Sequence, residues 1–251
     1  MASEKTDAIV VRVVNWSETS CIVTLLTRDF GLISGLAKGA RRLKSPFESA
    51  LDLLALCRIV FIPKAGDVLD LLTEAKLLRR FRSGQQSLLS LYCGYYVAEL
   101  LTATIHADQP LPELFDVTDF CLRELDEGGS PFVATLRFEL QILRILGHLP
   151  ALDRCAACGD AIQAESFANF GLAVGGVLCR NCLPGQNHIF KLRHTSIEIL
   201  SRLSQSTWND ITLPQITSEN KYEIRRTIQR YLTYHIDRKL RLHDLLDDLA
   251  R

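Results

Sequence analysis

DAIVVRVVNWSETSCIVTLLTRDFGLISGLA, residues 7–37, consists of three short runs that are rich in β-branched residues and separated by turn signals. The runs cover residues 7–15, 20–28 and 31–37. Valine, isoleucine and threonine fit a pleated, half-buried surface, so each run predicts a strand. Asp29-Phe30-Gly31 lies between the second and third runs and predicts a hairpin turn. The chain therefore begins with short strands.

Two more strand-like runs lie downstream, at about residues 54–62 and 68–76. A polar, basic stretch at 38–49 separates them from the first three, and its glycine, proline and charges do not suit a strand. Five short strands with a longer connection after the third predict a small barrel of the OB type. A sandwich or an SH3-like barrel is the competing interpretation.

The hydrophobic period changes after Ser83, where apolar residues begin to recur at helical spacing. Prolines and glycines mark several of the helix ends. The predicted helices cover residues 84–105, 111–127, 131–147, 195–206 and 219–235. We therefore expect an α+β multidomain protein, with an OB-fold β-barrel over residues 1–82 and an α-helical domain over 83–251.

Two CxxC pairs interrupt the helical region, Cys155-Ala-Ala-Cys158 and Cys179-Arg-Asn-Cys182, with 20 residues between them. This spacing is typical of a structural zinc site, because each pair closes a tight turn that directs two thiolates at one ion. Four cysteines complete a tetrahedral shell and leave no open position, so we expect one structural Zn²⁺ in a four-cysteine zinc finger inserted at about 152–187. A redox or disulfide pair and an iron–sulfur cluster are the alternatives.

The other four cysteines stand alone in apolar surroundings, at Cys21, Cys57, Cys93 and Cys121. We interpret them as small buried hydrophobic residues. No secretory signal is recognisable, so disulfides are not expected.

The overall composition is that of an ordinary soluble protein, with 47% hydrophobic and 23% charged residues and a formal net charge of zero. No run of 18 apolar residues is present, so a transmembrane helix is not expected. Residues 1–82 carry 13 basic against 9 acidic residues. This uneven distribution favours one nucleic-acid face beside surfaces for protein partners.

The basic residues are densest just after the third predicted strand. Lys38, Arg41, Arg42 and Lys44 fall within seven residues, which we call the basic loop (residues 38–44). Cations along the rim of a barrel suit phosphate binding, and Trp16 and Phe47 are the candidate groups for base stacking, with Phe30 a weaker one. The alternative is an ordinary solvated loop.

Two further arginine clusters are present, one at residues 79–82 and one at 225–230, the latter expected on one side of the last long helix. No nucleotide-binding loop, nucleophile elbow or HExxH motif is found, and no carboxylate cluster suggests Mg²⁺. We therefore expect a protein that is not an enzyme.

The same residues resemble a known family. The N-terminal text shares Ser17-Glu18-Thr19-Ser20, Thr27 to Gly31, and Lys38-Gly39-Ala40-Arg41-Arg42 with RecO, the bacterial recombination mediator family. The resemblance continues through Leu72 to Ala75, Leu146-Gly147, Leu152 to Cys155, Gly175 to Cys179, Arg230 to Leu232 and Lys239 to Leu242. It covers nearly the whole chain and is weakest in the middle helices.

The resemblance implies an OB-fold, a helical domain and a four-cysteine zinc finger in a protein of the RecF pathway of DNA repair. Proteins of this family bind single- and double-stranded DNA, anneal complementary strands, engage the C-terminal tail of SSB and, with RecR, help load RecA. By that analogy Lys38, Arg41 and Arg42 contact DNA phosphates, and Lys44 and Arg12 extend the surface. The SSB tail would bind the helical domain.

The implied location is the bacterial cytoplasm, in association with the nucleoid and without membrane contact. Two alternatives stay open at this point. One is a zinc-stabilised scaffold protein that does not bind DNA, and the other is an accessory domain of a nucleic-acid enzyme. Binding to labelled oligonucleotides separates the first from a mediator, and divalent-dependent turnover of nucleic acid would support the second.

Overall fold

A computed structural model describes residues 2–42, 44–47, 50–66, 68–85, 87–105, 109–162, 166–205, 213–243 and 246. The chain divides into two compact units. The first contains residues 1–131 together with 244–250, and the second contains residues 132–243.

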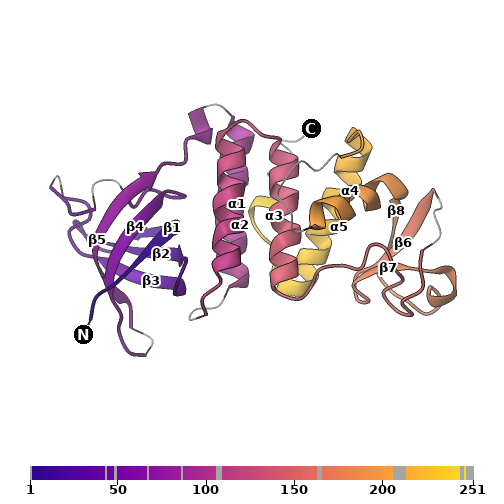
Figure 1. The fold of residues 1–251 in the computed structure, drawn as a ribbon, viewed down its shortest axis with the longest axis horizontal. Coiled ribbons are helices and arrows are strands. Elements are labelled where there is room, and N and C mark those ends of the chain that lie inside the picture. Colours follow the sequence, from indigo (N-terminus) through magenta and orange to yellow (C-terminus); the bar gives the residue numbers. More distant parts are fainter. Residues whose placement is uncertain are drawn as a thin grey trace. The chain divides into compact units, whose positions relative to one another are not determined.

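The first unit contains a closed five-stranded barrel with the strand order β1-β2-β3-β5-β4 (Figure 1). All neighbours are antiparallel except β3 and β5, which pair in parallel and close the barrel. This confirms the predicted OB-type barrel. The strands run from Glu4–Asn15 (β1), Cys21–Thr27 (β2), Gly31–Ala37 (β3), Leu56–Ile62 (β4) and Asp70–Arg79 (β5).

The barrel interior is filled by alternate side chains of the strands, as the period of two requires. In β2 the side chains of Cys21, Val23 and Leu25 are buried, whereas Ile22 and Thr24 are only partly covered. Buried residues from the other strands complete this core, among them Val10, Ile33, Ile59, Phe61 and Leu72.

The turn between β2 and β3 is the predicted hairpin. Gly31 adopts a left-handed φ of 71°, which glycine accommodates without strain. The Thr27 hydroxyl accepts a hydrogen bond from the Phe30 N–H (3.0 Å) and donates one to the Gly31 carbonyl (2.7 Å). The turn is thus fixed by its own side chains and backbone.

Two helices of the same unit follow the barrel, α1 (Leu88–Thr104) and α2 (Pro112–Asp126). The Ser87 side chain caps α1 by accepting from the Ser90 N–H, and Pro112 occupies the first turn of α2. The last barrel strand ends at Arg79, while the predicted domain boundary after residue 82 stays a prediction.

The second unit joins three helices to a small antiparallel sheet of order β7-β6-β8 (Figure 1). The third strand of this sheet, β8, was not predicted. The elements are α3 (Pro131–Ile145), β6 (Phe167–Gly171), β7 (Gly176–Leu178), β8 (Ile189–Arg193), α4 (His194–Ser204) and α5 (Ser218–Ile236). Among the described residues, no helix is both long and apolar enough to cross a membrane.

Candidate metal centre and nucleic-acid face

The four cysteines of the two CxxC pairs come together in the second unit. The sulfur atoms of Cys155, Cys158, Cys179 and Cys182, here called the cysteine cluster, all lie within 4.8 Å of one another. The Sγ atoms of Cys158 and Cys179 are 3.8 Å apart. Four convergent thiols on two tight turns form a group that can hold one metal ion.

The backbone explains how distant cysteines meet. A hairpin of β6 and β7 lies between the two pairs, and Cys179 follows β7 directly. The first turn closes when the Gly159 N–H bonds to the Cys155 carbonyl (2.8 Å), with Gly159 in the left-handed region at a φ of 79°. The second closes from the Cys182 N–H to the Cys179 carbonyl (3.2 Å).

The thiols of Cys155 and Cys158 in this cluster have perturbed pKa values. Burial opposes ionisation of Cys155, but backbone N–H groups, first that of Cys179, donate to its sulfur and lower the pKa to about 6. For Cys158 the largest single effect is the Asp160 N–H, which lowers the pKa. The hydrogen bond with Cys155, burial and the weaker side-chain hydrogen bonds together outweigh it and raise the pKa to about 12. A divalent cation would stabilise all four thiolates together and release the remaining protons.

No histidine among the described residues belongs to the cysteine cluster. Among the described residues the only metal-ligating side chains grouped there are the four cysteines. His148 stacks on His235 with ring centroids 4.4 Å apart, just beyond the end of α3. The four single cysteines, Cys21, Cys57, Cys93 and Cys121, are all buried as predicted.

The basic loop lies at the end of the barrel where β1 meets β2. Lys38, Arg41, Arg42 and Lys44 are all exposed, and so is Arg12 on β1. Arg12 stands opposite Thr24 on β2. These cations therefore face solvent, as phosphate-binding groups must.

Hydrogen bonds join the basic loop to the turn between β1 and β2. The Arg41 N–H donates to the Thr19 carbonyl (3.0 Å), and its guanidinium donates to the Ser17 carbonyl (3.2 Å). The Gly39 N–H donates to the Ser20 hydroxyl (3.3 Å). The two segments thus form one surface, in which the Trp16 turn and the cations lie side by side.

Of the candidate stacking groups, only Trp16 is available at the surface, with 66% of its area exposed. The expectation for Phe47 is wrong, because its side chain is 2% exposed and packs in the barrel core. Phe30 contacts Phe61 edge to face, with centroids 5.3 Å apart. The chain returns into the barrel after the basic loop, which the local sequence does not reveal.

The third arginine cluster also differs from expectation. Arg226 and Arg230 are exposed on α5, but Arg225 is buried and pairs with Glu139 of α3 (2.7 Å). In the second cluster Arg79 pairs with Asp119 of α2. These two arginines hold the structure together and are not free for a nucleic acid.

Comparison with known proteins agrees with this arrangement. The family model described as Recombination protein O N terminal matches residues 1–81, and that described as Recombination protein O C terminal matches residues 85–243. The chain belongs to the RecO family. The junction between the two RecO models falls where β5 has ended and α1 has not yet begun.

Several relatives carry the name DNA repair protein RecO. The protein of Rhodopirellula baltica is 52% identical over 198 residues, which are 78% of this chain and 73% of the relative. That of Anaeromyxobacter dehalogenans strain 2CP-1 is 32% identical over 251 residues, or 100% of this chain and 98% of the relative. That of Listeria innocua is 27% identical over 99% of this chain and 95% of the relative. The likeness to RecO proteins therefore extends over barrel and helices alike.

Proposed function

We propose that this protein is a DNA repair and recombination mediator that binds DNA through the basic loop and anneals complementary single strands. The observation that carries the proposal is the joining of the basic loop to the Trp16 turn, which gathers exposed cations and one exposed aromatic ring on one end of the barrel. Lys38, Arg41 and Arg42 would contact phosphates, and Lys44 and Arg12 would extend the path of the strand.

This function requires no chemistry on the nucleic acid, and we propose that the protein is not an enzyme. Annealing needs two polyanions to be held close while their bases stay free to pair. Arginine and lysine side chains neutralise the phosphates, and an exposed indole offers a stacking surface that tolerates any base. Binding should therefore depend weakly on sequence and fall as salt rises.

The partners in this proposal come from the RecO resemblance. RecR would act with this protein to load RecA onto DNA coated with SSB, and the C-terminal tail of SSB would bind the helical domain. The site of action would be the bacterial nucleoid, in the cytoplasm. DNA would be bound in both single- and double-stranded form.

We further propose that the cysteine cluster holds one structural Zn²⁺. Zinc–sulfur bonds of about 2.3 Å in a tetrahedron place the sulfur atoms about 3.8 Å apart. The 3.8 Å between the Sγ atoms of Cys158 and Cys179 matches that value. The metal would fix the two turns and leave no position for water or substrate.

The test is the annealing of complementary oligonucleotides coated with the cognate SSB, with and without this protein. We expect acceleration that disappears at high salt. The variant Lys38→Ala/Arg41→Ala/Arg42→Ala should lose it, and the slope of log affinity against log salt should fall by about 2, since each single-strand phosphate contact contributes about 0.7.

A matched control removes three exposed lysines elsewhere, Lys5, Lys76 and Lys221. It has the same net charge as the triple variant and should keep the annealing rate and the salt slope. If both variants lost annealing activity equally, the effect would come from the lower net charge and not from the basic loop. If a folded, metal-loaded sample did not bind DNA at low salt, the mediator proposal would be wrong and the scaffold alternative would take its place.

A further inference from the structure

The strand β8 is an edge of the small sheet, and its outer side carries unpaired backbone groups. Within the part of the chain that the structure describes, β8 pairs only with β6, in the order β7-β6-β8. The pairs His188–Leu172 and His194–Ser166 at its two ends are hydrogen-bonded. Because hydrogen-bonded and non-bonded pairs alternate in an antiparallel ladder, the even-numbered residues of β8 bond to β6. The N–H and C=O groups of Ile189, Lys191 and Arg193 therefore point away from the sheet.

Helix α5 faces this edge and already satisfies one of these groups. The Arg193 N–H donates to the carboxylate of Glu223 on α5 (3.0 Å). Within the described residues, the outward backbone groups of Ile189 and Lys191 have no partner. The sheet edge is thus closed at Arg193 and open at the two preceding outward residues.

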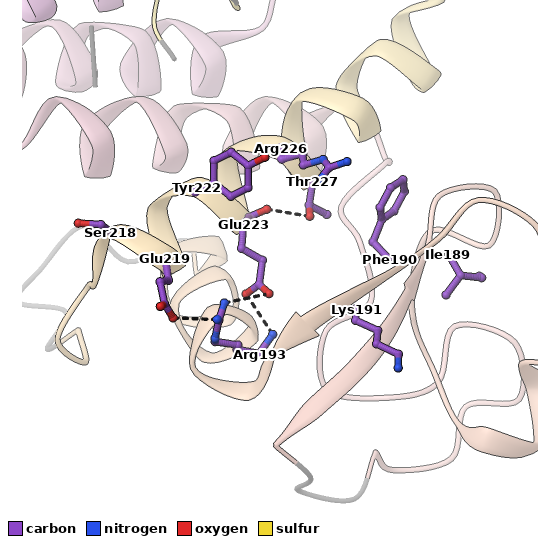
Figure 2. A pocket seen from close by; sticks show the side chains of 10 residues that line it. All are labelled: Ile189, Phe190, Lys191, Arg193, Ser218, Glu219, Tyr222, Glu223, Arg226 and Thr227. Carbon is purple, nitrogen blue, oxygen red and sulfur yellow. Dashed lines mark hydrogen bonds and ion pairs between the residues drawn. The ribbon is translucent and has the colours of Figure 1, made fainter. Parts of the chain in front are cut away.

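A groove of about 680 Å³ lies between β8 and α5, here called the edge groove. Figure 2 shows β8 on one side and α5 on the other, with Glu219 and Glu223 both reaching the Arg193 guanidinium. Its lining combines the exposed Tyr222 ring and the half-buried Ile189 and Phe190 side chains with charged residues. The lining residues are Ile189, Phe190, Lys191, Arg193, Ser218, Glu219, Tyr222, Glu223, Arg226 and Thr227.

The charges of the edge groove favour an anionic occupant. Both carboxylates of the lining are engaged with Arg193, at 2.7 Å for Glu219 and 3.5 Å for Glu223. Lys191 and Arg226 are exposed and have no ion pair within the described residues. Arg230, one turn beyond Arg226, lies over the Phe190 ring at 4.7 Å and adds a third cation near the groove.

We propose that the edge groove binds an extended, acidic segment of a partner protein, which adds to β8 as a fourth strand. The free N–H and C=O groups of Ile189 and Lys191 would pair with the peptide backbone, as in other cases of strand addition. Acidic side chains of the segment would approach Lys191 and Arg226, and its apolar side chains would lie against Tyr222. This inference does not rest on the proposed DNA function.

The backbone edge distinguishes a peptide from a nucleic acid. An outward edge residue offers a donor and an acceptor together, and a peptide backbone supplies the complement of both. A phosphodiester backbone supplies acceptors alone, so it would leave the outward carbonyls of Ile189 and Lys191 without donors.

The test uses the full-length, metal-loaded protein and a fluorescein-labelled peptide of alternating Asp and Val residues, followed by fluorescence anisotropy. We expect saturable binding, with protection of the Ile189 and Lys191 amides from hydrogen exchange. A peptide of alternating Lys and Val should not bind. The Asp–Val peptide with alternate N-methylated amides should bind about twofold to tenfold more weakly for each backbone hydrogen bond lost.

Three variants test whether the peptide binds in the edge groove. Arg226→Glu should weaken binding roughly fivefold or more, because it removes one attraction and adds a repulsion. Lys191→Pro removes an N–H that the fold leaves unpaired, which an edge strand tolerates, and should also weaken binding. Lys221→Glu is the matched control, because Lys221 is exposed on α5 but does not line the edge groove, and it should bind as the wild type does.

The outcomes separate the alternatives. Retained metal content and an unchanged thermal transition show that a variant is folded, and Lys191→Glu replaces Lys191→Pro if the latter is not. Absence of Asp–Val binding, or binding unaffected by Arg226→Glu and by N-methylation, would overturn the proposal. The proposal would also be overturned if the protein bound an oligothymidylate but not the acidic peptide, and if Arg226→Glu abolished that binding. The groove would then be a nucleic-acid contact.

Discussion

The buried ion pair between Glu139 of α3 and Arg225 of α5 gives the sharpest stability prediction. The two charged groups are 2.7 Å apart, and their side chains are 0% and 10% exposed. At an effective dielectric constant of about 20, their attraction is about 6 kcal/mol, but each ion loses several kcal/mol of hydration. The pair as a whole therefore contributes little net stability, whereas either ion left alone is strongly unfavourable.

We expect Arg225→Met to lower the free energy of unfolding by about 3–5 kcal/mol, because it removes the cation that is paired with the buried Glu139 carboxylate. Glu139→Leu should cost a similar amount, because it removes the carboxylate that is paired with the buried guanidinium. The double variant Glu139→Leu/Arg225→Met should lie close to the wild type or above it. Arg202→Met is the surface control, since its pair with Glu198 is more than a third exposed, and it should cost less than about 1 kcal/mol.

Urea unfolding followed by circular dichroism at the helical minimum measures these differences. With an m-value of about 2 kcal/mol/M, the midpoint of Arg225→Met should fall by about 2 M, and that of the double variant should recover. If the double variant lost as much as the two single variants together, the charges would be stabilising independently of each other. The reasoning from desolvation would then be refuted.

Two further predictions concern the second unit. We expect elemental analysis of the wild type to find one equivalent of zinc. Chelation or Cys179→Ser/Cys182→Ser should remove this zinc and speed hydrogen exchange in β7, whereas Cys121→Ala should keep it. Full zinc retention in the double variant would contradict the assignment of ligands. His235 has a lowered pKa, first through burial and then through the nearby His148, and its Nε2 has no hydrogen-bond partner in the described part of the chain. Its neutral form is therefore favoured by folding, so its contribution to stability is present above the unfolded pKa of about 6.5 and is lost as pH falls below that value. The loss of unfolding midpoint between pH 7.5 and 5.5 should be smaller in His235→Phe than in the wild type, and equal losses would contradict the prediction.

Most elements could be predicted because their signals are local. The period of two in β2 and the helical period in α2 follow from which face each segment buries, and both are legible in a single run of residues. The cysteine cluster was predictable for the same reason, since the spacing within each pair is set by one turn of backbone. The burial of Cys57, whose pKa burial raises to about 12, likewise follows from the alternation of its own strand.

The errors concern contacts that no local pattern encodes. Phe47 follows Ser45-Pro46 and looks like part of an exposed loop, yet the chain turns there into the barrel core. β8 is only five residues long, and it forms a strand because its backbone pairs with the free edge of β6. For Arg225 a signal was available, since it shares helical spacing with the buried Ile228 and Leu232. A charge inside an apolar stripe requires a buried partner, and Glu139 lies between buried Phe138 and Leu140 in α3.

The two candidate binding surfaces share a physical logic that the side chains alone do not reveal. In the barrel, backbone hydrogen bonds from Arg41 and Gly39 to the neighbouring turn decide that the cations stand beside Trp16. In the second unit, Cys179 directly follows β7, so a metal on the cysteine cluster would hold the strand pairing that leaves Ile189 and Lys191 facing outward. A closed four-cysteine site offers no reactive position of its own. Any contribution of such a site to function would therefore lie in the shape of the surface that it maintains. Within the described residues, that surface includes the open edge of β8, where backbone groups of Ile189 and Lys191 have no partner.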